Sequence, residues 1–243
     1  MYALEVKNIK YSINNTKIID NISFFVKEGE FSTIIGPSGC GKSTLLRIIA
    51  GLIRQDYGSV RICGKKPEEE KIGFVFQEFA LFPWLSAIEN VEIGTANLDI
   101  DEKEKERRCE EWLERFRLSG FEDAYISSLS GGMKQRVGIA RALVSDPSVL
   151  LMDEPFSSLD ELTANSLRHD TLSVLKDSKS LKCVLMVSHN VEEAVEMSDR
   201  IIVLSDKPSK VKKILEIKEH YKSRAEKGFL EKVEEIYEAL SYS

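Results

Sequence analysis

A glycine-rich segment with a lysine near its end, GPSGCGKST, occupies residues 36–44. Glycines at this spacing let the backbone turn tightly and point its N–H groups inward, where they and the N-terminus of a following helix bind phosphate oxygens. Lys42 would place a positive charge on the β- and γ-phosphates, and the Ser43 hydroxyl would coordinate Mg²⁺. The segment predicts a site for a nucleoside triphosphate and Mg²⁺, made of Gly36, Pro37, Ser38, Gly39, Cys40, Gly41, Lys42, Ser43 and Thr44.

Two acidic residues follow an apolar run in VLLMDEP at 149–155. An aspartate at the end of a strand beside a phosphate loop holds Mg²⁺ or its water shell, which is the role predicted for Asp153. Glu154, directly beyond it, is then placed to polarise an attacking water as a general base. A solvated acidic turn is the alternative for this pair taken alone, and the phosphate-binding segment at 36–44 favours the catalytic interpretation.

A second anion-binding device lies in LSGGMKQR at 129–136. A hydroxyl and bare backbone precede a helix expected to begin near Met133, and a helix N-terminus attracts anions. The chain thus has two phosphate-binding devices and one lysine-bearing loop, which a head-to-tail dimer explains, because each ATP would contact both devices, one from each copy. A glycine-rich helix cap is the structural alternative. The residues of this second device are Ser130, Gly131 and Gly132.

Alternating apolar residues predict antiparallel strands at 4–13 and 18–27, joined by Asn14-Asn15. A short buried strand at 31–35 would run into the glycine loop, and apolar residues at helical spacing follow the loop, as a phosphate site requires. Strands and helices alternate again later, which indicates an α/β fold with a parallel sheet covered by helices. These later segments are strands at 149–152, 183–187 and 201–204, a helix at 161–176 and a helix that runs through Ala194.

Residues from about 86 to 148 have helical character and predict a helical subdomain inserted into the α/β core. One apolar face there follows the spacing i, i+3, i+4 and i+7 and consists of Cys109, Trp112, Leu113 and Phe116. A further amphipathic helix is expected at 222–240, packed on the core, and a helix lying on a membrane surface is the alternative. Its apolar residues are Phe229, Val233, Ile236, Tyr237 and Leu240.

Composition limits the classes of protein that the chain can represent. Its 243 residues suffice for one large α/β domain with a lobe or for two small domains, and a net charge of −6 argues against binding of nucleic acid. The longest apolar runs have the length of strands and no charged-then-apolar leader opens the chain, so we expect a cytoplasmic protein. The cysteines lack the spacing of a metal site or a disulfide framework, so we expect all four to be reduced: Cys40, Cys63, Cys109 and Cys183.

The combination of LSGGMKQR with GPSGCGKST before it and LLMDEP after it resembles the ATP-binding subunit of ABC transporters, over about residues 2–217. The resemblance implies a P-loop NTPase (RecA-like) core with a parallel sheet, an N-terminal antiparallel β subdomain and an inserted helical subdomain. It also implies hydrolysis of ATP with Mg²⁺. We therefore expect 1–243 to be a single ABC ATPase domain, with its core at about 1–85 and 149–217, its helical lobe at about 86–148 and a C-terminal helix at about 222–240.

The same resemblance assigns roles to further positions. Tyr11 matches the aromatic residue that stacks on adenine, and Gln77 matches the glutamine that touches Mg²⁺ and the attacking water and senses the membrane partner. His189 matches the histidine that contacts the γ-phosphate and pairs with the Glu154 position. The place of His189 at the end of a parallel strand, where α/β sheets bind ligands, agrees with that role. The segment Ser158-Leu159-Asp160 matches a loop that crosses the dimer interface.

Four remaining polar positions are interpreted more plainly. Asn190 stands where the family usually has Asp, and Ser188 stands where Thr is common. Neither departure puts ATP binding or hydrolysis in doubt. His169 and His220 lack a motif around them and are interpreted as surface residues.

The segment after Gln77 reads EFALFPWLSAIENV and is too apolar for an exposed loop unless something covers it. In ABC transporters this region forms the groove that receives a short helix of the membrane subunit. The wording LFPWLSAIENV and the methionine of LSGGM are similar to importers for nitrate, sulfonates, taurine, bicarbonate and thiamine precursors. A core position in the helical lobe is the alternative for Trp84. The residues expected to form the groove are Glu78, Leu81, Phe82, Trp84 and Leu85.

The resemblance thus implies the ATPase of an importer for a solute of the nitrate, sulfonate or taurine type. Its partners would be a second copy of itself, an integral membrane permease and, indirectly, an external solute-binding protein, and it would lie peripherally on the cytoplasmic face of the membrane. The alternative is a soluble ABC ATPase, such as an iron–sulfur cluster assembly ATPase, which the LFPWL segment disfavours. An ordinary P-loop kinase would not explain LSGGMKQR.

Overall fold

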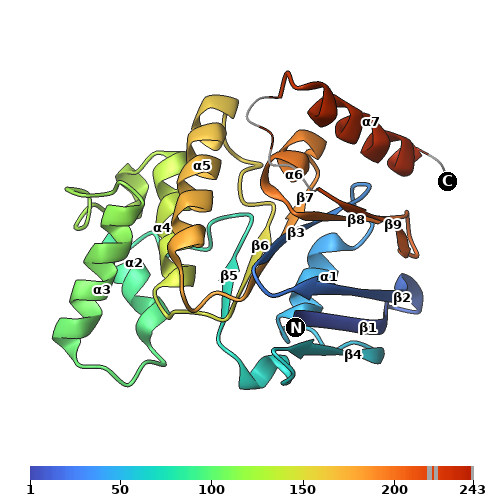
Figure 1. The fold of residues 1–243 in the computed structure, drawn as a ribbon. Helices are drawn as coiled ribbons and strands as arrows, with labels where there is room; N and C mark the ends of the chain where they lie inside the picture. Colours follow the sequence, from blue (N-terminus) through green and yellow to red (C-terminus); the bar gives the residue numbers. More distant parts are fainter. Residues whose placement is uncertain (218–220, 222–223, 242–243) are drawn as a thin grey trace. The chain divides into compact units, whose positions relative to one another are not determined.

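The structure, a computed structural model, describes residues 1–217, 221 and 224–241 (Figure 1). Its elements group into two units, Met1–Glu70 with Lys182–Ser243, and Lys71–Leu181. The second unit is wider than the helical lobe expected at 86–148, because strands and a helix that flank the lobe in sequence pack with it. His220 and residues 222–223 of the expected C-terminal helix lie outside the described residues.

An antiparallel sheet belongs to the first unit. Its first two strands, β1 (Tyr2–Ile13) and β2 (Thr16–Lys27), pair as expected and are joined by Asn14-Asn15, whose φ angles are 48° and 64°. Asparagine tolerates this left-handed conformation, and two such residues form the tight turn whose twist suits a hairpin. β4 (Tyr57–Ile62), which the sequence pattern did not predict, pairs with the other edge of β1.

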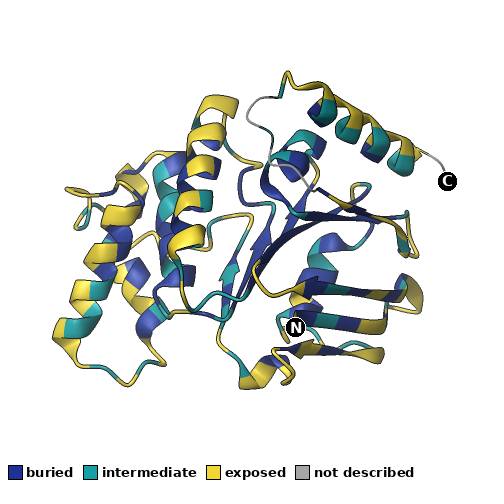
Figure 2. Cartoon of the chain, in the orientation of Figure 1, coloured by how far each residue is buried: buried dark blue, intermediate teal, exposed yellow. Residues whose placement is uncertain are grey.

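The second sheet of this unit contains β3 (Glu30–Ile35), β7 (Cys183–Ser188) and β8 (Arg200–Leu204), all buried along their whole length (Figure 2). β3 pairs in parallel with both β7 and β8, as the sequence predicted. β9 (Val211–Glu216) then adds an antiparallel edge to β8. A short connection returns the chain for this pairing, and the N–H of Ser205 donates to the carbonyl oxygen of Lys210 at 2.9 Å.

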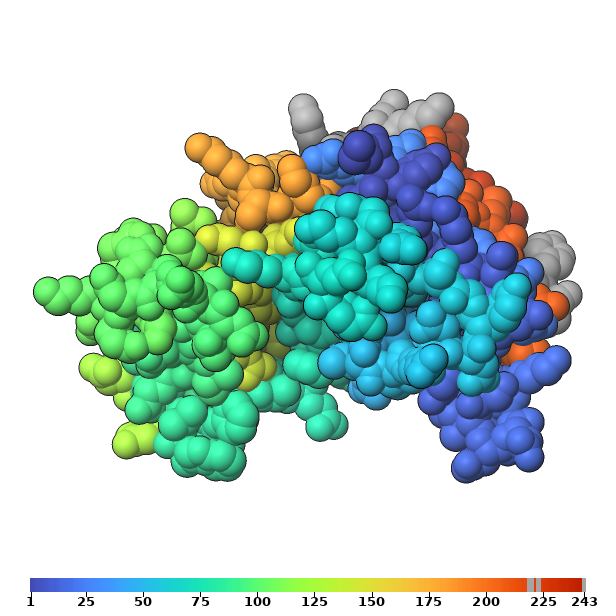
Figure 3. Space-filling view, turned by 90° about the horizontal axis from the view of Figure 1, so that it is seen from below, coloured from blue at the N-terminus to red at the C-terminus, as the bar shows by residue number. Residues whose placement is uncertain are grey.

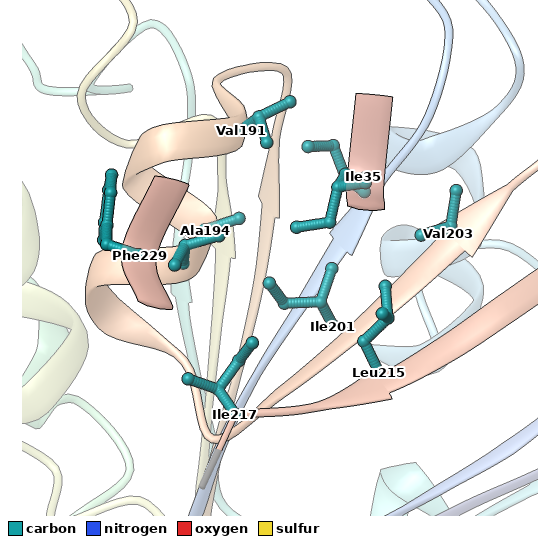
Figure 4. Close-up of a cluster of buried hydrophobic side chains, with 10 residues drawn as sticks. Ile35, Val191, Ala194, Ile201, Val203, Leu215, Ile217 and Phe229 are labelled. Atoms are coloured by element: carbon teal, nitrogen blue, oxygen red, sulfur yellow. The ribbon is translucent and has the colours of Figure 1, made fainter. Parts of the chain in front are cut away.

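Helices α1 (Lys42–Ile49), α6 (Val191–Met197) and α7 (Lys227–Ser241) complete the first unit, with a short 3-10 turn, η1 (Pro67–Glu69). The apolar residues that predicted a helix after the glycine loop are buried in α1. Phe229 and Ile236 of α7 are buried in a cluster with side chains from β3, α6, β8 and β9 (Figure 4). Because protein covers this face of α7, the alternative of a membrane-surface helix is disfavoured.

The second unit, all of which the structure describes, contains two strands and four α-helices: β5 (Ile72–Val75), β6 (Val149–Asp153), α2 (Ala87–Glu92), α3 (Glu102–Arg115), α4 (Gly131–Leu143) and α5 (Glu161–Asp177), with 3-10 turns η2 (Ile93–Thr95) and η3 (Ile126–Ser128). β5 and β6 pair in parallel, and α4 packs against β5, α2, α3 and α5. Charged residues of α3 lie at the surface (green in Figure 3). The apolar face predicted for α3 is confirmed, because it is buried at all four positions: Cys109, Trp112, Leu113 and Phe116.

The packing of α7 can be tested by removing its central aromatic ring. Phe229→Ala should lower the free energy of unfolding by about 3 kcal/mol, because the ring is buried. It also packs edge-to-face on the ring of Tyr221, with 5.6 Å between the ring centroids. Tyr237→Ala, which removes an exposed ring from the same helix, should lower it by less than about 0.5 kcal/mol. Urea denaturation followed by circular dichroism measures both variants, and equal losses would contradict the packing described.

Candidate active site

The glycine loop at 36–44 links the end of β3 to the first turn of α1, in the strand–loop–helix order that a phosphate site requires. Gly39 and Gly41 have φ angles of 72° and 110°, which residues with a Cβ rarely adopt. A Cβ on Gly41 would also lie 2.9 Å from Cγ2 of Ile18. Glycine is therefore required at these two positions, and the tight turn that it permits orients the N–H groups of the loop.

The ammonium group of Lys42 lies inside this loop, and only 5% of the residue is exposed. Its Nζ donates to the carbonyl oxygens of Gly36 at 2.9 Å and Pro37 at 3.0 Å. In the part of the chain that the structure describes, Lys42 pairs with no carboxylate. An ammonium group has three N–H donors, so one remains for a ligand, and a buried cation held by neutral carbonyls favours an anionic one.

The first turn of α1 adds a hydroxyl and a helix N-terminus to the loop. Ser43 and Thr44 lie in this turn, which contains no acidic residue, so the partial positive charge of the helix N-terminus is not offset by a carboxylate of its own. Ser43 is half-buried, and Ser38 is exposed. Backbone donors, an ammonium group and a hydroxyl together form a donor set that suits a polyphosphate with a hard metal ion.

Cys40 is buried in the loop, where a Cβ on Gly36 would lie 3.1 Å from its Sγ. Burial raises the pKa of this thiol, although the charge of Lys42 opposes the shift. Little thiolate therefore forms near neutral pH, and reaction with alkylating agents is expected to be slow. All four cysteines are free in the structure, with Cys40, Cys109 and Cys183 buried and Cys63 exposed, and their reduced state stays a prediction.

Tyr11 and His189, which the resemblance assigned to the nucleotide, both belong to the first unit. Tyr11 is half-buried on β1 and is paired in register with Ile19 of β2. His189 is exposed directly after the last residue of β7. Stacking of Tyr11 on adenine and contact of His189 with the γ-phosphate stay predictions.

Hydrogen bonds fix the turn that carries His189. The N–H of Asn190 donates to Oγ of Ser188 at 2.9 Å, and the Ser188 hydroxyl donates to the carboxylate of Glu193. Asn190 also caps α6, because its Oδ1 accepts from the N–H of Glu193 at 3.1 Å. Asparagine caps a helix about as well as aspartate does, so the two departures from the family pattern preserve an ordered turn here.

In the second unit, the structure brings Gln77 and Glu154 together, with Nε2 of Gln77 donating to Oε2 of Glu154 at 3.4 Å. Asp153 is buried at the end of β6, and Glu154 follows it half-buried. The φ angle of Glu154 is 46°, a strained value for a residue with a side chain, and such strain is concentrated at functional sites. The carboxylate is therefore oriented by an amide donor and by its own backbone, as a general base requires.

A contact that the motif analysis missed fixes the backbone beyond Gln77. Phe79 and Ala80 are two consecutive left-handed residues, with φ angles of 56° and 49°. Arg141 of α4 donates to both of their carbonyl oxygens, at 3.0 Å from Nη2 to Phe79 and 2.7 Å from Nη1 to Ala80. Burial lowers the pKa of Arg141, and the fork of two hydrogen bonds offsets its desolvation. The sequence signal was an arginine in the otherwise apolar stretch GIARAL.

The Ser-Gly-Gly segment forms the start of α4. Ser130 is the N-cap, because its Oγ accepts from the N–H of Met133 at 3.3 Å, and Ser130 and Gly131 are exposed. Gly132 is buried, and a Cβ there would lie 2.5 Å from Cγ2 of Thr163 on α5. Packing of α4 on α5 therefore gives a structural reason for Gly132, besides the ligand contact that the sequence predicted for it.

The segment Ser158-Leu159-Asp160 leads into α5, and Asp160 is its N-cap. The Asp160 carboxylate accepts from the N–H of Thr163 at 3.0 Å, and hydrogen bonding to Thr163 lowers the pKa of this carboxyl. Ser158 is exposed and Leu159 is half-buried. The aspartate thus has a capping role that is independent of the interface role implied by the resemblance.

Other candidate groups contribute little. His169 is exposed on α5, as expected. Within the described ranges, no three His, Cys, Asp or Glu side chains are placed to hold a metal ion. None of the helices described is both long enough and apolar enough to cross a membrane.

Comparison with known proteins agrees with this arrangement. The family model described as ABC transporter matches residues 19–157. The aliphatic sulfonates import ATP-binding protein of a Bacillus cereus strain is 42% identical, over 93% of this chain and 89% of that protein. The taurine import ATP-binding protein of Pelagibacter ubique is 39% identical, over 80% of this chain and 74% of that protein.

A solved structure has the same fold. It is the dimeric ATP-binding cassette MJ0796 in a post-hydrolysis state bound to ADP and Pi, with a TM-score of 0.76 and 34% identity, over 89% of this chain and 99% of that chain. The family model and the relatives each cover more than half of the chain. The chain therefore belongs to the ABC transporter family, as one of its ATP-hydrolysing cassettes.

Proposed function

We propose that this chain is the ATPase of an ABC importer for a small anionic solute of the sulfonate or taurine type. Two copies would close head-to-tail around two ATP molecules and drive an integral membrane permease, on the cytoplasmic face of the membrane. An external solute-binding protein would deliver the solute to that permease. Relatives named as sulfonate and taurine import proteins support this proposal over the alternative of an iron–sulfur cluster assembly ATPase.

One observation carries the importer part of the proposal. Trp84 is 69% exposed and Phe82 is 38% exposed, and their ring centroids lie 5.4 Å apart. The alternative of a core position for Trp84 is therefore wrong. An isolated cassette has no reason to expose two aromatic rings in contact, whereas a permease that covers them would remove them from water.

ATP binding would rest on the first unit. Lys42 would use its remaining N–H donor on the β- and γ-phosphates, and the loop backbone would bind their other oxygens. Tyr11 would stack on adenine. Mg²⁺ would be held by the Ser43 hydroxyl, the amide oxygen of Gln77 and the Asp153 carboxylate, all of them hard oxygen ligands. When bound, the ion supplies positive charge to the phosphates.

Hydrolysis would rest on Glu154. Its carboxylate would take a proton from a water molecule while the water oxygen bonds to the γ-phosphorus, and the bond from that phosphorus to the bridging oxygen breaks, which yields ADP and Pi. Gln77 would orient this water and the carboxylate together, since it already donates to Glu154. His189 would donate a hydrogen bond to the γ-phosphate.

The N-terminus of α4 would complete the site of the other copy. The exposed Ser130 and Gly131 would present a hydroxyl and N–H groups to the γ-phosphate bound by that copy. Gly132 would contribute its N–H while its α-carbon packs on α5. A dimer with two such sites follows from a twofold axis.

The role of Glu154 is tested by Glu154→Gln. This variant should lose turnover by about 10²–10⁴-fold, because an amide cannot accept the proton. ATP binding should persist, since Lys42 is unchanged, and ATP with Mg²⁺ should then hold a dimer that size-exclusion chromatography detects. Glu110→Gln, on the exposed face of α3, is the matched control and should retain turnover. A Glu154→Gln variant that hydrolyses ATP at the normal rate would refute the assignment.

Arg141 is tested as the residue that positions the turn after Gln77. Arg141→Ala should lower the free energy of unfolding by about 1–3 kcal/mol, because the carbonyls of Phe79 and Ala80 lose a charged donor. It should also lower kcat while KM for ATP stays near its normal value, since the ATP-binding loop is untouched. Arg141→Lys keeps the positive charge but lacks the planar guanidinium that donates to both carbonyls, so it should recover part of kcat.

Two outcomes decide between positioning and general stability. Arg107→Ala removes an exposed arginine of α3 and should leave both kcat and stability nearly unchanged. If Arg141→Ala raises KM and lowers kcat in equal proportion, or if Arg141→Lys recovers stability without kcat, Arg141 does not act through the turn.

The importer assignment is tested by Phe82→Ser combined with Trp84→Ser. Each ring buried by the permease contributes about 1.5–3 kcal/mol, so affinity for the permease should fall by roughly 10²–10⁴-fold. The melting temperature and basal hydrolysis should stay nearly unchanged, because the rings are exposed. Leu230→Ser with Tyr237→Ser changes two exposed residues of α7 and is the matched control. A stable Phe82/Trp84 variant that still co-purifies with the permease would place the docking site elsewhere.

A further inference from the structure

Two segments of the second unit contain no basic side chain. Between Lys71 and Lys103 the chain has neither Lys, Arg nor His, and it carries six carboxylates, at Glu78, Glu89, Glu92, Asp99, Asp101 and Glu102. Between Arg117 and Lys134 the chain again has no basic residue, and it carries two carboxylates, at Glu122 and Asp123. In a chain with 34 lysines and arginines, such gaps give these segments a strongly negative local charge.

Hydrogen bonds join the two segments side by side. The N–H of Ala87 donates to the carbonyl oxygen of Ala124 at 2.9 Å, and the N–H of Ile88 donates to that of Glu122 at 2.9 Å. Ser86 and Tyr125 form an isolated antiparallel bridge. The start of α2 and the loop after α3 therefore form one continuous surface.

That surface carries four exposed aromatic rings. Tyr125 is 60% exposed and Phe121 is 45% exposed, and they add to the pair of Phe82 and Trp84. We call these four residues the aromatic surface. Its extent goes beyond the segment after Gln77, because Phe121 and Tyr125 come from the loop that follows α3.

The carboxylates beside the aromatic surface are not neutralised within the part of the chain described. Glu78, Glu122 and Asp123 form no ion pair there, and Glu78 and Asp123 are exposed. On α3, Glu102, Glu104 and Glu111 pair with lysine or arginine of the same helix, whereas Glu106, Glu110 and Glu114 form no ion pair within the described residues. The aromatic surface is distinguished because two of its unpaired carboxylates, Glu122 and Asp123, lie between the exposed rings of Phe121 and Tyr125 in the chain.

Contacts within the chain account for only some of the carboxylates in these two segments. Glu89 completes a capping box with Ser86, since its carboxylate accepts from the N–H of Ser86 at 2.7 Å. Two basic groups that contact the first segment are already occupied, because Arg141 donates to the carbonyls of Phe79 and Ala80 and Lys105 pairs with Glu102. Glu78, Glu122 and Asp123 have no such role, so their charge remains for an outside group.

We infer that the permease segment covering the aromatic surface is amphipathic and cationic, with apolar side chains for the rings and Lys or Arg for Glu122 and Asp123. The inference rests on the proposed function. A complementary charge of this kind steers association and selects partners more than it adds affinity. An anionic lipid surface is excluded as the occupant, because carboxylates repel it.

The experiment measures binding of the purified chain to its permease in nanodiscs of neutral lipid, by surface plasmon resonance at about 50 mM and about 300 mM salt. Glu122→Lys with Asp123→Lys reverses the charge beside the rings. It should slow association at low salt by about tenfold and abolish most of the salt dependence that the wild type shows. Glu106→Lys with Glu110→Lys makes the same change in net charge on the exposed face of α3 and should behave like the wild type.

Each result decides the inference. Equal association rates for the two reversal variants, or a wild type whose association is independent of salt, would overturn it and leave the importer proposal intact. Failure of the wild type to bind the permease would instead refute the proposed function.

Sedimentation of the nucleotide-free chain tests whether a second copy covers the surface instead, and it should show a monomer. If it shows a dimer that Glu122→Lys with Asp123→Lys dissociates, the surface belongs to a second copy and the inference is overturned. If the reversal variant is unstable, Glu122→Gln with Asp123→Asn tests the same charges and should lose part of the salt dependence.

Discussion

The rest of the site depends on the burial of the Lys42 ammonium group, which pairs with no carboxylate among the residues that the structure describes. Lys42 is held by two backbone carbonyls, and neutral dipoles do not cancel a full charge in a place that water reaches poorly. The loop accepts this situation because glycines at 39 and 41 let the backbone close around the ammonium group. An anionic ligand relieves the imbalance, so the loop is organised for phosphate before phosphate is present.

In the second unit, the candidate site depends on backbone strain. Phe79, Ala80 and Glu154 all have left-handed φ angles without being glycine. Each such residue carries a conformational cost of about 1–3 kcal/mol that neighbouring contacts must offset. Arg141 supplies two hydrogen bonds to the first two, and Gln77 supplies one to the third. Side chains held in this way need little rearrangement when a ligand binds.

Periodicity and motif spacing predicted most of the fold, because those patterns are local. The hairpin of β1 and β2 and the buried face of α3 are examples, since each follows from alternation or helical spacing within one segment. The sequence also predicted that a strand leads into the glycine loop and that a helix follows it, which the structure confirms. It could not predict the strand β9, whose residues are mostly exposed and lack alternation, or the packing reason for Gly132, which depends on Thr163 far along the chain. The role of Arg141 was hidden for the same reason, since its partners are carbonyls that no side-chain pattern reveals.

In the second unit, a short turn joins the aromatic surface to Gln77. Gln77, which donates to Glu154, is separated from Phe82 and Trp84 by a single short turn. A flexible turn would absorb any movement of the aromatic rings, because its φ and ψ angles could change freely. Here Arg141, in the last turn of α4, fixes this turn by donating to the carbonyl oxygens of Phe79 and Ala80. The aromatic rings of Phe82 and Trp84 are therefore joined to Gln77 by a backbone segment that α4 holds in place.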